Sequence, residues 1–143
     1  MATHFNMNRR NFIVQTVVGS AALTGVLTFA SCKTIEVLSL EPSNKRLDVP
    51  VSKFATANFL RVRSSVLQYD VLVVKSANNT YSAYYMKCTH NDASVQFDGR
   101  NFQCPLHGSS FDGNGKVLTG PATNNLRTFE VTQNENLISI FIS

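Results

Sequence analysis

The chain has 143 residues, of which 43% are hydrophobic and 15% are charged, and it contains no tryptophan. This length supports one hydrophobic core of modest size and excludes a second one. The formal net charge is +4, but Arg9 and Arg10 belong to a segment that we expect to be removed, and the rest of the chain carries 11 basic and 9 acidic residues. No basic stripe interleaved with aromatic residues accompanies this small charge, so we expect no binding to nucleic acid.

Residues 1–31 are typical of an export signal. Two adjacent arginines precede an uncharged and mainly apolar run at 12–30. The segment resembles a twin-arginine signal, which directs proteins that cross a bacterial membrane in the folded state. An ordinary Sec signal with two arginines in its basic region is the alternative.

The signal ends in Phe29-Ala30-Ser31-Cys32, which resembles a lipobox. A lipid on Cys32 would then tether the mature protein to a membrane. The alternative is an uncleaved anchor, because a helix of this run at about 1.5 Å per residue would reach roughly 28 Å, close to the thickness of a bilayer core. Both interpretations predict an exported protein that is anchored on the periplasmic or outer side of a bacterial envelope.

Residues 32–143 are predicted to form an all-β domain. Short stretches in which apolar and polar residues alternate are separated by turn signals, and no amphipathic helix is expected after residue 31. Pro50 lacks a backbone N–H group, so its strand should lie at the edge of a sheet. The expected strands lie near 35–38, 47–51, 59–62, 69–75 and 81–86, followed by a final hairpin of 126–132 and 137–142.

Two of the three cysteines and two of the three histidines lie close together in the sequence. They form the pairs Cys88-x-His90 and Cys104-x-x-His107. Thiolate and imidazole are ligands that zinc and iron prefer, and two short pairs on separate loops can surround a metal from two sides. The pattern predicts a four-ligand metal site, and a single tetrahedral zinc is one possible occupant.

Thirteen residues separate the two ligand pairs, and these residues predict a short hairpin. Val95, Phe97 and Phe102 alternate with polar neighbours around Asp98-Gly99. Because this dipeptide favours a type I′ turn, we expect a tight and stiff connection between the two ligand loops.

The two ligand pairs, with Gly108-Ser109 after the second pair and Gly120-Pro121-Ala122 further on, closely resemble the motifs of the Rieske iron-sulfur family. The resemblance implies an antiparallel β-sandwich with a small inserted cluster-binding subdomain at about 87–122. It also implies a [2Fe-2S] cluster with two Cys on the inner iron and two His on the outer iron. The segment around Pro121 matches the family's third loop, which covers the cluster, and an ordinary proline turn is the alternative.

Carried over residue by residue, the resemblance makes Cys88 and Cys104 ligands of the inner iron, and His90 and His107 ligands of the outer iron.

Three positions depart from the high-potential branch of this family. Ala93 and Leu106 occupy the positions of two cysteines that form a disulfide in that branch, and Phe111 replaces a tyrosine that hydrogen-bonds to a ligand sulfur. Ser109, which matches a serine that hydrogen-bonds to cluster sulfur, is kept. Because such hydrogen bonds stabilise the reduced cluster, we expect a potential in the middle or lower part of the family range of roughly −150 to +300 mV.

The leading interpretation is a membrane-tethered protein that carries one electron at a time between redox proteins and is not an enzyme by itself. A Rieske subunit of a quinol-oxidising cytochrome bc-type complex is the alternative within redox biology. The competitor from another class is a zinc-binding lipoprotein with a structural role. A Rieske oxygenase is excluded, because this chain lacks the length and the histidines for a second iron site.

Overall fold

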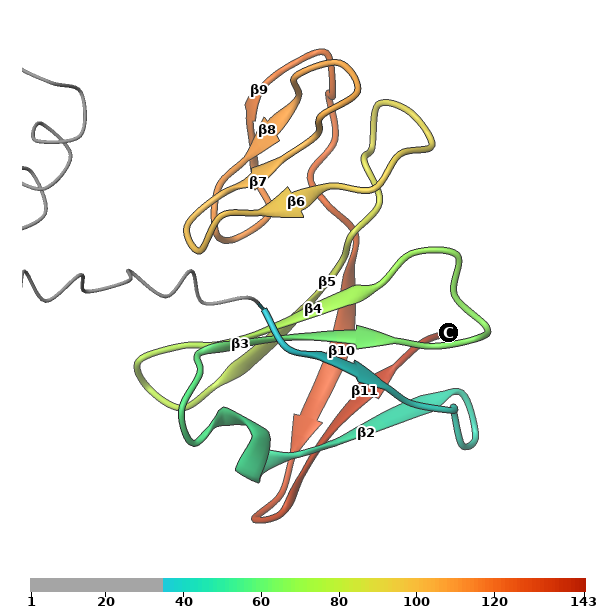
Figure 1. Ribbon diagram of the computed structural model, residues 1–143, viewed down its shortest axis with the longest axis vertical. Helices are drawn as coiled ribbons and strands as arrows, with labels where there is room; N and C mark the ends of the chain where they lie inside the picture. Colours follow the sequence, from blue (N-terminus) through green and yellow to red (C-terminus); the bar gives the residue numbers. More distant parts are fainter. Residues whose placement is uncertain (1–34) are drawn as a thin grey trace, which may run out of the picture. The chain divides into compact units, whose positions relative to one another are not determined.

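The computed structural model describes residues 35–143 of the chain. The predicted export signal, the lipobox and Cys32 therefore lie outside the described residues. Within this range no helix is long and apolar enough to cross a membrane. The described residues form two β-sheets, a large sheet and a small one that lies beyond one end of its strands (Figure 1).

The described part of the chain contains eleven strands and one short helix. The strands of the large sheet are β1 (Val37–Ser39), β2 (Arg46–Pro50), β3 (Phe59–Arg63), β4 (Val71–Lys75), β5 (Tyr81–Tyr85), β10 (Thr128–Gln133) and β11 (Leu137–Phe141). The small sheet consists of β6 (Gln96–Phe97), β7 (Phe102–Gln103), β8 (Ser110–Phe111) and β9 (Val117–Thr119). A four-residue 3-10 helix, η1 (Val51–Phe54), follows β2.

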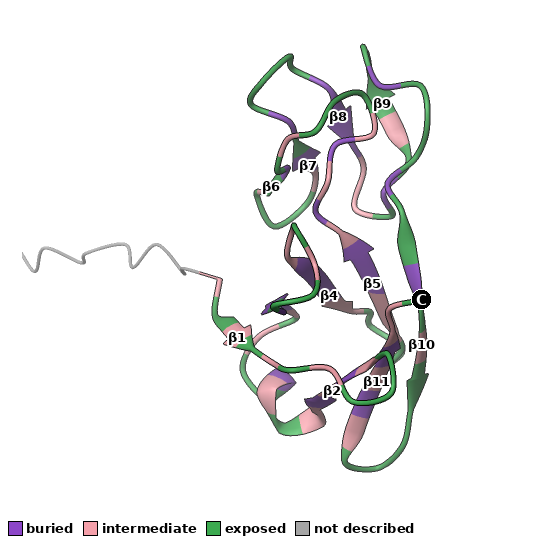
Figure 2. Ribbon diagram, turned by 90° about the vertical axis from the view of Figure 1, so that its right-hand side faces the viewer, coloured by how far each residue is buried: buried purple, intermediate pink, exposed green. Residues whose placement is uncertain are grey.

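The large sheet has the strand order β1-β3-β4-β5-β10-β11-β2 and curls around its own core. Strand β10 pairs with β5 through its first residues and with β11 through its later ones, so it joins the two halves of the sheet. Buried apolar side chains from both halves pack together, and Figure 2 shows buried positions in strands of both halves, including β4, β5 and β11. The fully buried members of this core include Leu47, Val49, Leu60, Val62, Val71, Val73, Ile138 and Ile140.

The small sheet is inserted between β5 and β10 and has the order β6-β7-β8-β9. Its second core, which we call the cluster-side core, contains Phe102, Phe111, Cys88 and Cys104. Buried residues of the large sheet, among them Leu72 and Tyr84, pack into the same core. The metal-ligand motifs therefore lie on a unit that is fastened to the end of the large sheet by shared apolar contacts.

The predicted all-β architecture is confirmed, with two differences in the large sheet and one in the β6–β7 hairpin. Pro50 does end an edge strand, but Val51 begins η1 and does not extend β2. The pairing of β1 with β3 is parallel, which departs from the expected antiparallel pattern. This arrangement is possible because β2 and η1 lie between the two strands in sequence, which leaves enough chain for a crossover.

The hairpin between β6 and β7 is present, but its turn is not type I′. That turn needs positive φ at both central residues, and here only Gly99 has one, with φ of 99°. The Asp98 carboxylate accepts hydrogen bonds from the backbone N–H groups of Arg100 and Asn101 at 2.8 Å each. The hydrogen bonds to the Asp98 side chain therefore stabilise this turn, whereas the prediction relied on a type I′ backbone conformation.

Candidate metal centre

The four predicted ligands lie on two loops at the end of the small unit. Cys88 and His90 follow β5, and Cys104 and His107 lie between β7 and β8. Both cysteine side chains are only 2% exposed, whereas both histidines are exposed. The structure thus brings the two sulfurs into the cluster-side core and leaves the two imidazoles at the surface.

Each ligand loop is closed by an equivalent backbone hydrogen bond. The N–H group of Cys88 donates to the carbonyl of Ala93 at 2.8 Å, and the N–H group of Cys104 donates to the carbonyl of Ser109 at 2.8 Å. In each loop the donor is the ligand cysteine, and the acceptor lies five residues further along the chain. Gly108 has a φ of 77°, a left-handed conformation that a residue with a side chain adopts only at a cost, so the second loop depends on glycine there.

The surroundings of Cys88 favour its thiolate form. Burial acts to raise its pKa, but hydrogen bonds to its sulfur from the backbone of Asn91 and His90 and from the side chains of Cys104 and Ser109 lower the pKa overall. Thiolate is the form of cysteine that binds metals. Cys88 and Cys104 are not joined by a disulfide, so both sulfurs are available as ligands.

The two imidazoles form a pair at the surface. The ring centroids of His90 and His107 are 5.0 Å apart and their planes meet at 81°. This spacing allows each ring to direct a nitrogen toward one ion at the usual metal–nitrogen distance of about 2.0–2.1 Å. Among residues 35–143 no three His, Cys, Asp or Glu side chains converge on a single point. The four predicted ligands are instead arranged as a buried sulfur pair and an exposed imidazole pair.

The segment 120–126, which we call the third segment, is tied to both ligand loops by hydrogen bonds. The backbone N–H group of Ala122 donates to the Ser109 hydroxyl at 3.0 Å in the second loop. From the first loop, the Thr89 hydroxyl donates to the backbone carbonyl of Asn124 at 2.6 Å. Sequence reasoning missed Thr89 and Asn124, because nothing in the local pattern indicates a contact between residues 35 positions apart.

The remaining predicted site residues occupy different environments. Phe111 is fully buried in β8, next to the second ligand loop, and Pro121 is exposed beside the buried Ala122. Ala93 is half-buried, and Leu106 is 53% exposed, although it directly precedes His107. The second loop therefore presents an apolar side chain and an imidazole to the solvent together.

This donor set fits a two-iron cluster whose irons have different ligands. Such a cluster needs one pair of thiolates and one pair of imidazoles, and the described residues supply these as two separate pairs. The hydroxyl of Ser109 accepts from Ala122, and its own hydrogen remains available for a bond to sulfur.

Comparisons with known proteins agree with this arrangement. A family model described as the Rieske [2Fe-2S] domain matches residues 47–130. The cytochrome b6-f complex iron-sulfur subunit 1 of Nostoc sp. (strain PCC 7120) is 33% identical over 100 residues, which cover 64% of this chain and 55% of the relative. The ferredoxin component of the naphthalene 1,2-dioxygenase system of Pseudomonas putida is 34% identical over 81 residues, which cover 48% of this chain and 78% of the ferredoxin. The chain thus spans only about half the length of the b6-f subunit.

Solved structures with the same fold include a plasma membrane Rieske protein and a chain from an oxygenase–ferredoxin complex. The cyanobacterial plasma membrane Rieske protein PetC3 from Synechocystis PCC 6803 matches with a TM-score of 0.54 and 31% identity, over 64% of this chain and 93% of that protein. A chain in the complex of reduced oxygenase and oxidised ferredoxin of carbazole 1,9a-dioxygenase matches with a TM-score of 0.52 and 27% identity. That match covers 70% of this chain and 95% of the other.

Proposed function

Because the chain belongs to the Rieske [2Fe-2S] domain family, we propose that Cys88, His90, Cys104 and His107 hold a [2Fe-2S] cluster through which the protein carries single electrons between redox partners. Cys88 and Cys104 would bind the inner iron, and His90 and His107 the outer iron. The observation that carries this assignment is the contrast in exposure, with two buried sulfurs beside two exposed imidazoles that are 5.0 Å apart.

The residues around the ligands suit an electron carrier. When bound, the cluster supplies a centre that accepts and releases one electron. The cluster-side core keeps water from the sulfur pair, while the exposed imidazoles offer a short path to a docked partner. The Ser109 hydroxyl, held by Ala122, can donate to sulfur and so stabilise the reduced state.

We expect a reduction potential in the middle or lower part of the family range of roughly −150 to +300 mV. Ala93 and Leu106 provide no disulfide between the ligand loops, and Phe111 has no hydroxyl to donate to a ligand sulfur. Protein-film voltammetry of the loaded protein measures this value. A potential near the top of the range would contradict the expectation.

The cluster assignment predicts visible colour, two irons and two acid-labile sulfides per chain. Substituting Cys88→Ser, Cys104→Ser, His90→Ala or His107→Ala should abolish the intact cluster, whereas Cys32→Ser should keep it and serves as the matched cysteine control. The measurements are absorption spectroscopy with iron, zinc and sulfide analysis. A colourless protein with one zinc and no sulfide would instead establish the structural zinc lipoprotein.

We further propose that residues 1–31 direct export and that the mature protein is held on the periplasmic or outer side of a bacterial envelope. A lipid on Cys32 would provide the tether, with an uncleaved N-terminal helix as the alternative. The names of the b6-f subunit and of the plasma membrane Rieske protein support a membrane association. Mass spectrometry of the membrane-extracted protein separates the two forms. A lipid tether predicts a lipidated Cys32 at the new N-terminus, whereas an uncleaved anchor predicts an unmodified Cys32 in a chain that keeps residues 1–31.

A second candidate function is that of a Rieske subunit in a quinol-oxidising cytochrome bc-type complex. The observation that favours it is the similarity to the b6-f subunit, and the absence of a cysteine at Ala93 and Leu106 weighs against it. Purification from native membranes distinguishes the two. A b-type cytochrome that stays bound, detected by its haem absorption, would support the complex, and its loss under mild detergent would support an independent carrier.

A further inference from the structure

A cavity of about 500 Å³ lies where the large sheet meets the two ligand loops. Strand β3 contributes Arg61 on one side. The opposite side comes from the end of the first ligand loop and the start of β6, and from the tip of the second ligand loop. The lining residues are Arg61, Ala93, Ser94, Val95, Gln96, Pro105 and Leu106. Both positions at which the resemblance places a disulfide in the high-potential branch, Ala93 and Leu106, thus border this space.

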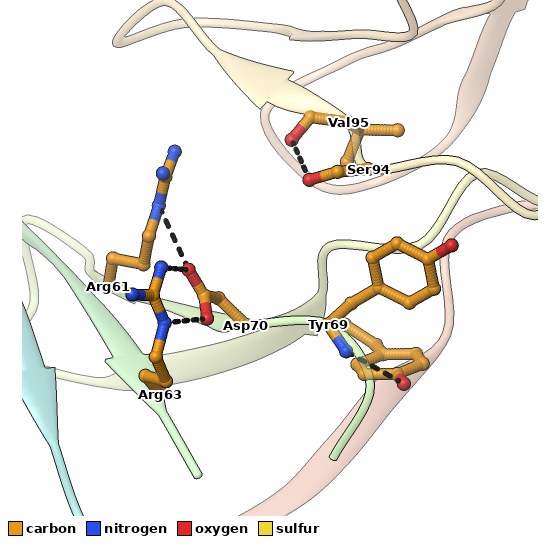
Figure 3. Close-up of polar contacts among 7 residues, drawn as sticks. Arg61, Arg63, Tyr69, Asp70, Ser94 and Val95 are labelled. Atoms are coloured by element: carbon orange, nitrogen blue, oxygen red, sulfur yellow. Dashed lines mark hydrogen bonds and ion pairs between the residues drawn. The ribbon is translucent and has the colours of Figure 1, made fainter. Parts of the chain in front are cut away.

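Arg61 lines the cavity and forms only one long ion pair within the described residues. Its Nε is buried and has no hydrogen-bond partner among residues 35–143. The nearest carboxylate, Asp70, has Oδ2 at 3.9 Å from this nitrogen, which is too far for a hydrogen bond. Both oxygens of Asp70 are already taken by Arg63, at 2.9 and 3.0 Å. Figure 3 shows Arg63 joined to both oxygens of Asp70, whereas Arg61 is joined to Asp70 through Nε alone and the end of its guanidinium extends past the carboxylate.

The surroundings of Arg61 therefore hold one uncompensated positive charge. Two arginines share the single carboxylate of Asp70, and the buried N–H donor of Arg61 has no partner, which is unfavourable. Two further polar side chains line the cavity. The Ser94 hydroxyl makes only a long bond of 3.4 Å to the carbonyl of Val95, and the Gln96 side chain is exposed. An acceptor placed in the cavity would meet donors from the lining side chains of Arg61, Ser94 and Gln96.

The other lining residues are apolar. Ala93, Val95, Pro105 and Leu106 offer aliphatic surface next to the three polar side chains, and Leu106 is 53% exposed at the rim. A volume of this size is typical of pockets for small molecules, which combine apolar walls with a few convergent polar groups. Arginine is well suited to a carboxylate, because its planar guanidinium can donate two parallel hydrogen bonds.

We propose that this cavity binds a small organic carboxylate carried on an apolar body. The guanidinium of Arg61 takes the carboxylate, with Ser94 and Gln96 as secondary donors, and the apolar body packs between Val95 and the Pro105-Leu106 tip. Such a ligand bridges the large sheet and both ligand loops.

Binding should also influence the cluster, an effect that rests on the proposed function. The ligand would lie against Leu106, the residue before His107, and a negative charge near the cluster favours the oxidised state over the reduced one. By thermodynamic reciprocity, a ligand that binds the oxidised protein more tightly lowers its reduction potential.

The binding test titrates the oxidised holoprotein into 4-fluorobenzoate and follows the 19F NMR signal. We expect saturable binding that weakens about tenfold or more in Arg61→Met, because a charge-assisted hydrogen bond is lost. Arg61→Lys keeps the charge without the planar fork and should also bind more weakly, and it serves if the methionine variant does not fold. Arg100→Met removes the same charge from the β6–β7 hairpin at a residue that does not line the cavity, and this variant should bind as the wild type does. Visible absorption of the cluster reports folding.

Three results would overturn the proposal. These are unchanged affinity in both Arg61 variants, equal binding of the uncharged 4-fluorobenzamide, or displacement of 4-fluorobenzoate by an equal concentration of inorganic phosphate. A separate voltammetric titration should show a potential that falls with 4-fluorobenzoate in the wild type and stays constant in Arg61→Met. Since the NMR arm requires no electron transfer, failure of the pocket and failure of the proposed redox function give different outcomes.

Discussion

Ser109 connects three parts of the candidate centre. It is fully buried, its hydroxyl accepts a hydrogen bond from the Ala122 N–H group at 3.0 Å, and its side chain contributes to lowering the Cys88 pKa. One hydroxyl group thus links the third segment to both a ligand sulfur and the second ligand loop. We therefore expect this serine to influence both the structure and the reduction potential.

Substituting Ser109→Ala should therefore lower both the stability and the reduction potential. The buried N–H group of Ala122 loses its acceptor, which costs about 1–3 kcal/mol of unfolding free energy. Urea denaturation and voltammetry measure the two effects. Ser110→Ala, at the neighbouring buried serine, is the matched control, and equal losses in both variants would refute a special role for Ser109.

Phe111→Tyr tests whether the missing hydroxyl lowers the potential. Phe111 is fully buried beside the second ligand loop, and a tyrosine there should raise the potential if its hydroxyl reaches a ligand sulfur. Phe102→Tyr adds the same group to the ring paired with Phe111 across β7 and β8, so it controls for polarity alone. Voltammetry of both variants decides the question, and the interpretation fails if their potentials shift equally or not at all.

At the scale of elements, the turn between β8 and β9 supports the third segment. Asp112 accepts hydrogen bonds from the N–H groups of Asn114 and Lys116 at 2.9 Å each, and Leu126 donates to the carbonyl of Gly115 at 2.8 Å. Gly115 has a φ of 77°, and an added Cβ would lie 3.1 Å from the Tyr84 ring. Glycine is thus required here both by the backbone conformation and by close packing on the large sheet.

A pair of glycine substitutions separates these two requirements. Gly99 also has a positive φ, but an added Cβ there meets no atom within 4 Å. Gly99→Ala should cost about 1–2 kcal/mol for its conformation, and Gly115→Ala should cost roughly 1–3 kcal/mol more because of crowding. Thermal unfolding of the two variants provides the comparison, and equal losses would show that Tyr84 yields at no cost.

The pairing of β2 with β11 includes a half-buried polar link. The Ser139 hydroxyl donates to Asp48 at 2.6 Å, and Arg46 Nη2 donates to the same carboxylate at 2.9 Å. The Ser139 hydrogen bond lowers the pKa of Asp48, against the opposing effect of burial, and Arg46 lowers it further. The ionised carboxylate therefore stabilises the edge of the large sheet.

This link should make stability depend on pH in the acid range. Because the folded pKa lies below the unfolded one, the contribution is complete above the unfolded value and disappears as the pH falls through the folded value. Asp48→Asn should be less stable than the wild type at pH 7, with a difference that shrinks toward strongly acidic pH. Urea midpoints at several pH values measure it. A stability difference that does not vary with pH would contradict this origin. The pH-dependent difference should be smaller when it is measured in the Ser139→Ala background.

At the scale of the whole molecule, the described residues contain two apolar cores, so the single core expected from the chain length is wrong. The core of the large sheet includes Val71, Val73, Ile138 and Ile140 and excludes the ligand cysteines, whereas the cluster-side core includes both of them. Losing the metal centre should therefore affect the small unit first. We expect the large sheet to remain folded, because its core is built without the two cysteines.

Hydrogen exchange of the Cys104→Ser apoprotein tests this separation. Amides of β7 and β8 should exchange at least about tenfold faster than in the loaded protein, because local opening of the small unit becomes easier. Amides of Val71–Val73 should stay protected, since β4 is paired with β3 and β5 on its two sides. Uniform acceleration across both sheets would show instead that they unfold as one cooperative unit.

The amino-acid sequence was sufficient to predict the features that depend on residues close together in the chain. Alternating apolar residues predicted the strands, Pro50 predicted an edge strand, and the spacing of the two ligand pairs predicted the family and its cluster. The ligand assignments remain a proposal, and the predicted signal and lipobox lie outside the described residues. Each confirmed prediction rests on a signal contained within a few residues, where backbone conformation and side-chain alternation are decided.

Only the tertiary structure decided which distant segments meet. The parallel pairing of β1 with β3, the hydrogen bonds from Thr89 to Asn124 and from Ala122 to Ser109, and the cavity at Arg61 all join segments far apart in the chain. No local pattern specifies such contacts, because they depend on how the two sheets pack. An arginine at position 61 has no special appearance in the sequence, and it becomes a candidate binding residue only because Arg63 occupies the carboxylate of Asp70.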